Sequence, residues 1–151
     1  MALQDLIPAL AEIDDNAGAI GAFGFRVGAE ISRVLATGTN WVMVPKTVKL
    51  IVRGQLKPGV HARDIGFRFA RMLNDGALDL DLDYRVLEYA GDLDQFGLAA
   101  RTALCSSPTE IQAYGVFLPP SEAILAHARA HAQRPFTPVY PDARAHYEAE
   151  F

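Results

Sequence analysis

The stretch that decides the fold is T-V-K-L-I-V-R, residues 47–53. Its side chains alternate as those of a β-strand do, apolar at 48, 50 and 52 and basic at Lys49 and Arg53. A turn signal, K-P-G at 57–59, comes next, and Ile65, Phe69 and Met72 then follow at helical spacing. A strand, a turn and an amphipathic helix in this order predict an α/β fold.

The same alternation continues toward the carboxyl terminus. Strands are predicted near residues 84–90 and 115–119, with helices from about residue 98 and over residues 120–132. The chain has 151 residues, half of them apolar, which is enough for one core. We therefore expect a single layered α/β/α domain with a small mixed sheet over residues 1–151. A Pro-rich tail from about residue 134 is expected to end in a short polar helix.

The amino-terminal part is unusually rich in glycine and alanine. The pattern predicts one helix from Gly18 to about Thr37, although each glycine inside a helix costs roughly 1 kcal/mol relative to alanine. Several glycines together indicate close backbone contact with another element or with a ligand. The face of this helix would then offer a surface for association.

Composition and charge exclude several classes of protein. The net charge of −4 is spread over interspersed acidic and basic residues, so no nucleic-acid interface is expected. A single cysteine cannot form an intrachain disulfide, which favours a reducing compartment. The start lacks the basic region of a signal peptide, and the longest apolar run is too short for a membrane span. A cytoplasmic protein without membrane contact is the expectation.

Several motifs recur in an order that is typical of one family. They are V-L-A-T-G-T-N-W-V-M-V-P-K-T-V-K-L, then G-Q-L-K-P-G-V-H-A-R-D-I, V-L-E-Y-A-G, R-T-A-L-C and V-F-L-P-P-S-E. Over about residues 18–125 the chain resembles the aconitase family, and within it the large subunit of 3-isopropylmalate dehydratase. The resemblance implies an aconitase-like domain and hydro-lyase chemistry on hydroxy-acids, performed in that family with a four-iron, four-sulfur cluster.

The cluster and part of the family active site have no counterpart here. A cluster of this kind needs three cysteines, and the sequence has only Cys105, which matches a family cysteine that is not a ligand. The family's Asp-Ser-His motif would fall in A-E-I-D-D-N-A, and its Cys-Asn pair reads Cys105-Ser106. We therefore predict no iron–sulfur cluster, no other cofactor and no metal site.

Glu110 is the candidate catalytic residue, because the resemblance matches it to the family's active-site glutamate. A carboxylate beside small and apolar residues can be desolvated and become a general acid or base, although an ordinary surface glutamate remains the alternative. Ser106, in the position of the family asparagine, is a candidate for substrate binding. Cys105 lacks a histidine nearby in the sequence, so a buried structural thiol is favoured over a nucleophile.

Three further residues are candidates for binding a substrate. Arg26 and Glu30 are four apart on the predicted Gly/Ala helix and would either orient a carboxylate substrate or pair with each other. His61 precedes a helix, where phosphate or carboxylate can bind, but a solvated turn histidine is the favoured interpretation.

Three functions remain open from the sequence. The chain is either a cluster-free domain performing acid/base isomerisation, elimination or cyclisation on a small molecule, a non-catalytic subunit or ligand-binding domain, or an inert piece of a longer hydro-lyase. The initial methionine favours an independent protein, and lost active-site motifs favour changed chemistry. A homodimer or a complex with a partner subunit is expected, because isolated family domains expose apolar surface.

Overall fold

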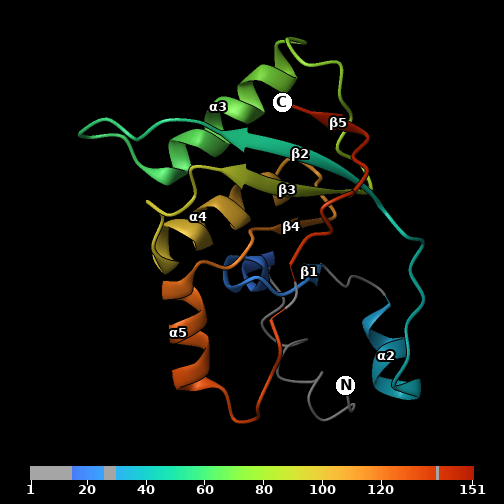
Figure 1. Ribbon diagram of the computed structural model, residues 1–151. Helices are drawn as coiled ribbons and strands as arrows, with labels where there is room; N and C mark the ends of the chain where they lie inside the picture. The colour runs from blue at the N-terminus through green and yellow to red at the C-terminus, as the bar shows by residue number, and fades with distance from the viewer. Residues whose placement is uncertain (1–14, 26–29, 139) are drawn as a thin grey trace.

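The computed structural model describes residues 15–25, 30–138 and 140–151. Its centre is a mixed five-stranded sheet with the strand order β1-β4-β3-β2-β5 (Figure 1). The parallel strands are β2 (Lys46–Val52), β3 (Arg85–Gly91), β4 (Gly115–Phe117) and β5 (Ala149–Glu150). The short β1 (Gly24–Phe25) pairs with β4 in the antiparallel direction.

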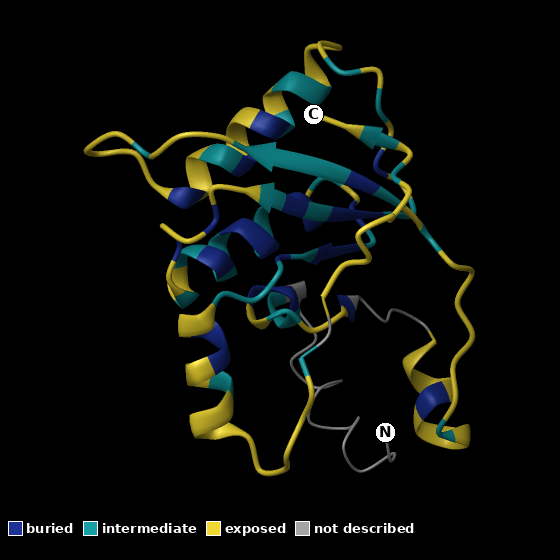
Figure 2. Cartoon of the chain, in the orientation of Figure 1, coloured by how far each residue is buried: buried dark blue, intermediate teal, exposed yellow. Residues whose placement is uncertain are grey.

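Two helices connect the central strands and pack on one face of the sheet. They are α3 (Ala62–Asn74) and α4 (Leu98–Thr109), which contact each other along their length. Val48 of β2 and Leu87 of β3 are paired in register and have no exposed surface. Phe69 from α3 and Leu104 from α4 join them in one core, visible as the dark bands of Figure 2. The alternation in residues 47–53 is thus explained by burial of one strand face.

The opposite face of the sheet is contacted by the carboxyl-terminal tail. Lys49 and Glu88 are paired in register there, and the Tyr147 hydroxyl donates a hydrogen bond of 2.9 Å to Glu88 Oε1. Lys49 Nζ lies 4.6 Å from the centre of the Tyr147 ring. The tail therefore lies against the sheet before it enters the edge strand β5.

The predicted single Gly/Ala helix is wrong. The segment forms a 3-10 helix, η1 (Asp15–Ile20), the strand β1 and a separate helix α2 (Ile31–Thr37). Gly21 has a φ of 79°, a left-handed conformation that ends η1 and that glycine adopts without strain. The expected close contact does occur, because a Cβ on Gly18 would lie 2.0 Å from the Val116 carbonyl oxygen.

The tail ends in a strand and not in the predicted polar helix. Residues 149–150 pair with β2, and Phe151 exchanges backbone hydrogen bonds with Lys49 and Ile51 at 3.0 and 2.7 Å. Glu148 forms ion pairs with Lys46 at 2.9 Å and with Arg85 at 2.6 Å. Lys46 and Arg85 lie far from Glu148 in the sequence. The polar residues of the tail alone therefore predicted a helix where the chain forms a strand.

The remaining predicted elements are confirmed, and with them the layered α/β class. The last helix, α5 (Glu122–His131), begins after Ser121, whose hydroxyl accepts a hydrogen bond from the Ile124 amide. Helix α4 runs without interruption, with Pro108 in its final turn. The helical spacing of Leu3, Ile7, Leu10 and Ile13 also predicts a helix over residues 2–13, which lies outside the described residues. Within the described ranges, no helix has the length and apolarity needed to cross a membrane.

Candidate functional site

Glu110 lies at the carboxyl-terminal end of α4, where its side chain is exposed. Ser106, one turn earlier, is half-buried, and its hydroxyl donates a long hydrogen bond of 3.4 Å to the Ala103 carbonyl within the helix. Neither residue lines the cavities described below. The structure therefore places both candidates at one end of α4 without enclosing them.

Glu30 lies near the amino-terminal ends of the parallel strands. Its charge helps to raise the pKa of Tyr114 to about 12, a shift caused first by burial of the phenol and next by the adjacent Tyr84. The two tyrosine rings are 4.6 Å apart, and the Tyr84 hydroxyl donates to the Met43 carbonyl. Tyr114 follows the turn that begins at Glu110, so Glu30 and Glu110 belong to the same end of the sheet. Arg26, the proposed partner of Glu30, lies outside the described residues.

His61 caps α3 and has a structural role there. Its side chain accepts a hydrogen bond from the Asp64 amide, and Asp64 Oδ2 accepts one of 2.8 Å from the His61 amide, which completes a capping box. These contacts engage the amides of His61 and Asp64 at the start of α3.

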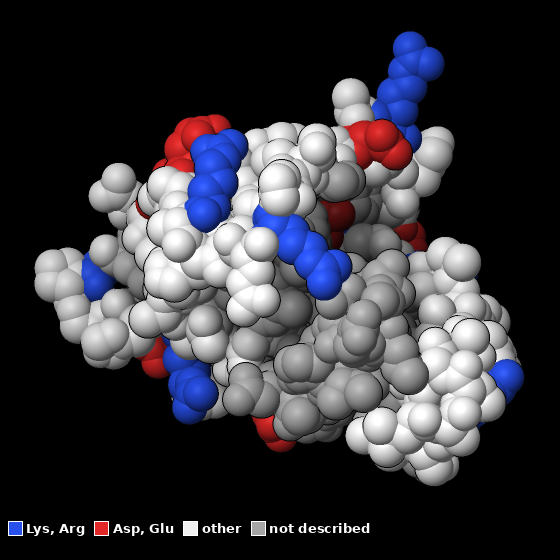
Figure 3. Space-filling model, turned by 90° about the horizontal axis from the view of Figure 1, so that it is seen from below, with Lys and Arg blue, Asp and Glu red and all other residues white. Residues whose placement is uncertain are grey.

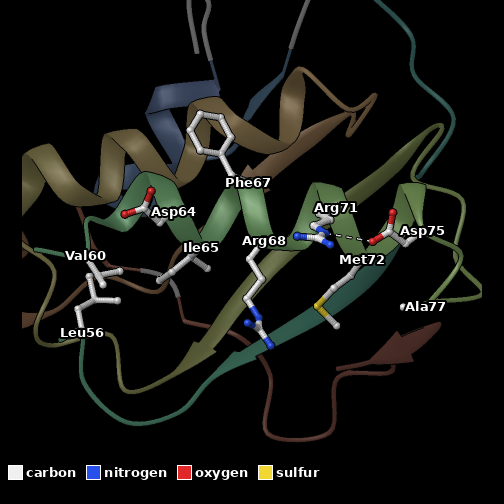
Figure 4. Close-up of a pocket in the computed structure, with 10 residues that line it drawn as sticks. All are labelled: Leu56, Val60, Asp64, Ile65, Phe67, Arg68, Arg71, Met72, Asp75 and Ala77. Atoms are coloured by element: carbon white, nitrogen blue, oxygen red, sulfur yellow. Dashed lines mark hydrogen bonds and ion pairs between the residues drawn. The ribbon is translucent and has the colours of Figure 1, made fainter.

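An open groove of about 730 Å³ follows the exposed side of α3 (Figure 4). Arg68, Phe67 and Met72 line it, and Arg71 pairs with Asp75 at 3.1 Å along its rim. Phe67 is 61% exposed. The groove thus has a mixed surface of apolar, basic and acidic groups, and its two carboxylates, Asp64 and Asp75, are engaged in the capping box and in the Arg71 ion pair.

Cys105 is fully buried in the core beneath η1. A Cβ on Gly18 would lie 3.3 Å from its sulfur, so the thiol is packed against the backbone of η1. As the only cysteine of the sequence, it cannot provide the three thiolates of a four-iron, four-sulfur cluster. Within the described ranges, no three His, Cys, Asp or Glu side chains are grouped to hold a metal ion. The residues of this chain therefore do not fit the cluster that the resemblance implies.

A second cavity, of about 440 Å³, lies between the sheet and the carboxyl-terminal tail. It opens at the carboxyl ends of β3 and β4, which is where ligands bind in many α/β proteins. Its polar lining comes from Lys49, Glu88, Asp94, Arg101, Ser121, Asp142 and Tyr147. These residues could not be grouped from the sequence, because they come from six separate segments.

Arg101 forms the innermost part of this lining and is only 1% exposed. Its guanidinium donates to the carbonyls of Phe96 and Pro119 at 3.0 and 2.8 Å, and more distantly to Leu93. Burial lowers its pKa, with the charge of Asp94 acting in the opposite direction. The sequence signal that could have found it is a lone arginine within the apolar run L-A-A-R-T-A-L-C.

Glu88 lies on the other side of the cavity, in the middle of β3, and is half-buried. Burial raises the pKa of its carboxyl group, and this effect is opposed by the Tyr147 hydrogen bond and the charge of Lys49. A carboxylate in an apolar strand, as in L-E-Y-A, could have marked it in the sequence.

Comparisons with known proteins agree with the sequence resemblance. Residues 15–150 match the model of the "Aconitase family (aconitate hydratase)". The chain is 34% identical to 3-isopropylmalate dehydratase large subunit 1 of Methanopyrus kandleri, over 88% of this chain and 31% of that protein. It is 32% identical to the probable methanogen homoaconitase large subunit of Methanosarcina mazei, over 89% and 34% of the two chains. The chain thus spans about a third of the length of these relatives.

Proposed function

Because the chain belongs to the aconitase family, we propose that it supplies the Glu110 carboxylate to an acid/base site for a small organic molecule. A second polypeptide completes this site. The observation that supports the proposal is the position of Glu110, exposed at the open end of α4 beside the turn to Tyr114. Proton transfer near neutral pH requires a raised carboxyl pKa, and removal of water from around the carboxylate is the usual cause. The exposed side chain therefore needs a covering surface.

The apolar surface between α2 and β2 favours such an assembly. Its side chains include Leu35, Trp41, Met43 and Val44, which are 57%, 71%, 64% and 87% exposed. In Figure 1, α2 and the irregular segment that follows it stand apart from the sheet. Figure 3 shows few charged residues on the part of the surface that they form. Soluble monomers seldom expose a contiguous apolar patch of this kind.

The covering polypeptide is either a second copy of this chain or a partner subunit. The names of the relatives support the second choice, since they are called large subunits. We expect the assembly to form in the cytoplasm, as the single cysteine suggests.

The chemistry proposed for the site is elimination, isomerisation or cyclisation of a small hydroxy-acid. Glu110 would remove or deliver a proton at carbon, and Ser106 and Glu30 would contact the substrate from the same end of the sheet. No step of this proposal uses an iron–sulfur cluster or another cofactor. The single cysteine of the chain cannot supply the three thiolates that such a cluster needs. In this respect the chemistry would differ from that of the wider family.

A non-catalytic role is the second candidate, as a ligand-binding domain, a non-catalytic subunit or an inert piece of a longer hydro-lyase. This chain matches only about a third of the length of each relative, and the rest of each relative has no counterpart in it. That difference in length favours a non-catalytic role.

The experiment that separates the two candidates is a turnover assay of the assembled protein with a panel of small hydroxy-acids. We expect Glu110→Gln to reduce turnover by about 100-fold or more while leaving substrate affinity nearly unchanged. Glu122→Gln, which alters another exposed glutamate at the start of α5, is the matched control. If Glu110→Gln and Glu122→Gln turn over a substrate equally, Glu110 is not the acid/base and the non-catalytic role is the better account.

A further inference from the structure

The cavity beneath the carboxyl-terminal tail contains two opposite charges that are not paired with each other. Arg101 is satisfied only by neutral backbone carbonyls, and Glu88 accepts a hydrogen bond from a neutral tyrosine hydroxyl. Among the described residues, neither side chain has an ion-pair partner within 4.0 Å. The nearest opposite charges, Asp94 for Arg101 and Lys49 for Glu88, act without forming an ion pair with them. The charges of Arg101 and Glu88 are therefore only partly compensated and also act on a charged ligand in the cavity.

The cavity lining carries charges of both signs, so a simple anion or cation is not the best ligand. Three carboxylates line the cavity, from Glu88, Asp94 and Asp142, and two cations, from Lys49 and Arg101. An anion would be repelled by the first group and a cation by the second. A molecule that carries both charges would be attracted by both.

The two charges come from different elements that line the cavity, Arg101 from α4 and Glu88 from β3. Arg101 donates to the Pro119 carbonyl, two residues before Ser121, which caps the amino terminus of α5. The unpaired backbone N–H groups of a helix start favour negative charge, as the guanidinium does. Glu88 lies in the middle of β3, beside Tyr147 of the tail.

We propose that this cavity binds a small amino acid in its zwitterionic form. The ligand's carboxylate lies toward Arg101 and the start of α5, and its ammonium group lies toward Glu88. The lining also includes apolar residues, which suit a short aliphatic side chain: Ala90, Leu93, Pro119, Pro120, Pro141 and Ala143. Its volume of about 440 Å³ is in the range of small-molecule sites.

This site is separate from the one proposed for Glu110. Arg101 lies in the first turns of α4 and Glu110 caps its last turn, so the two sites lie at opposite ends of the same helix. A ligand at Arg101 would contact the tail and not the open end of the sheet. The outcome of either experiment is therefore independent of the other.

The test is a titration of the full-length protein with L-valine, followed by calorimetry and by backbone NMR. Two probes that each lack one charge, isovalerate and isobutylamine, give the matched comparison. Inorganic phosphate tests a general anion site, and γ-aminobutyrate tests a wider spacing between the charges. We expect L-valine or γ-aminobutyrate to saturate the protein and both single-charge probes to bind at least about 10-fold more weakly. Resonances of Glu88, Arg101 and Ser121 should shift.

Each other outcome overturns the proposal. Equal binding of isovalerate or phosphate would indicate an anion site, and equal binding of isobutylamine a cation site. No shift at these residues with any probe up to about 10 mM would show that the cavity has no such ligand.

A pair of variants provides the second measurement. Glu88→Gln keeps the shape of the side chain and an acceptor for the Tyr147 hydroxyl, but removes the negative charge. It should weaken binding of the zwitterion by about 10-fold and leave isovalerate binding no weaker than before. Asp79→Asn is the control, because Asp79 is an exposed carboxylate between α3 and β3 that does not line the cavity. Equal effects of the two variants would contradict the assigned role of Glu88.

Discussion

Glu148 is held by two cations that belong to different strands. Arg85 Nε and Lys46 Nζ lie 2.6 and 2.9 Å from its carboxylate oxygens. The hydrogen bond from Arg85, followed by that from Lys46, lowers the pKa of Glu148 from an ordinary value of 4.5 to about 2. A carboxylate with a depressed pKa stabilises the fold above its unfolded-state pKa, and this contribution disappears as the pH falls through the folded-state pKa.

We therefore expect the effect of Glu148→Gln to depend on pH. The melting temperature should be lower than that of the natural protein above pH 4.5, and the two values should converge as the pH falls toward 2. Calorimetric scans at a series of pH values, with Glu122→Gln as a control, would measure the difference. A difference that stays constant over this interval would show that the ion pairs do not stabilise the fold.

Cys105 gives a second prediction at the scale of a single residue. Its side chain is fully buried, so Cys105→Ala should lower the free energy of unfolding by about 1 kcal/mol while any turnover persists. Urea unfolding and the activity of the assembled protein are the two measurements. Loss of turnover without a change in stability would instead identify a reactive thiol.

Helices α3 and α4 approach each other most closely at Gly66 and Ser107. A Cβ on Gly66 would lie 2.4 Å from the Ser107 Cβ, which is too close without movement of a helix. Gly66→Ala should therefore destabilise the natural protein by about 1–3 kcal/mol, as overpacking does. Urea unfolding measures this change.

The Ser107→Gly background is the control for this contact. There the obstructing side chain is absent, and Gly66→Ala should stabilise by about 1 kcal/mol because alanine favours a helix. If Gly66→Ala lowers the free energy of unfolding of the natural protein but raises it in the Ser107→Gly background, the contact is established. The same sign in both would show that the helices are spaced more widely than in the structure.

The sequence predicted the elements whose pattern is local and missed those set by distant partners. The alternation in residues 47–53 gave β2, and the apolar spacing of Ile65, Phe69 and Met72 gave α3, since each pattern reports burial of one face. Strand β5 was missed because its pairing partner lies about 100 residues away in β2. The division of the Gly/Ala segment was missed because the close approach of Gly18 to Val116 is not visible in local composition.

The candidate site could be predicted only in part for the same reason. Glu110 and Ser106 were found by their resemblance to a family motif, and the role of each stays a prediction. The charges of Arg101 and Glu88 were overlooked, because a single buried charge within an apolar helix or strand has no periodic signature. Only the three-dimensional arrangement brings them to one cavity.

At the scale of the whole molecule, the apolar surface from α2 to β2 predicts assembly. The double substitution Leu35→Ser and Met43→Ser should lower association without lowering the melting temperature, because both side chains are exposed in the single chain. Sedimentation velocity at micromolar concentration, with and without proteins from the native host, measures association. A natural chain that sediments as a monomer under both conditions would contradict the proposed assembly.

Trp41 is the only tryptophan of the sequence, and it lies within this surface with 71% of its side chain exposed. Its indole therefore provides an intrinsic fluorescent probe of the proposed contact, and no label is needed. The emission of the isolated chain should be that of an indole in water, and a blue shift with reduced quenching by iodide should accompany burial by a second polypeptide. Because the core contains no tryptophan, the signal reports the contact surface and not the fold, so the two events can be followed separately in one sample.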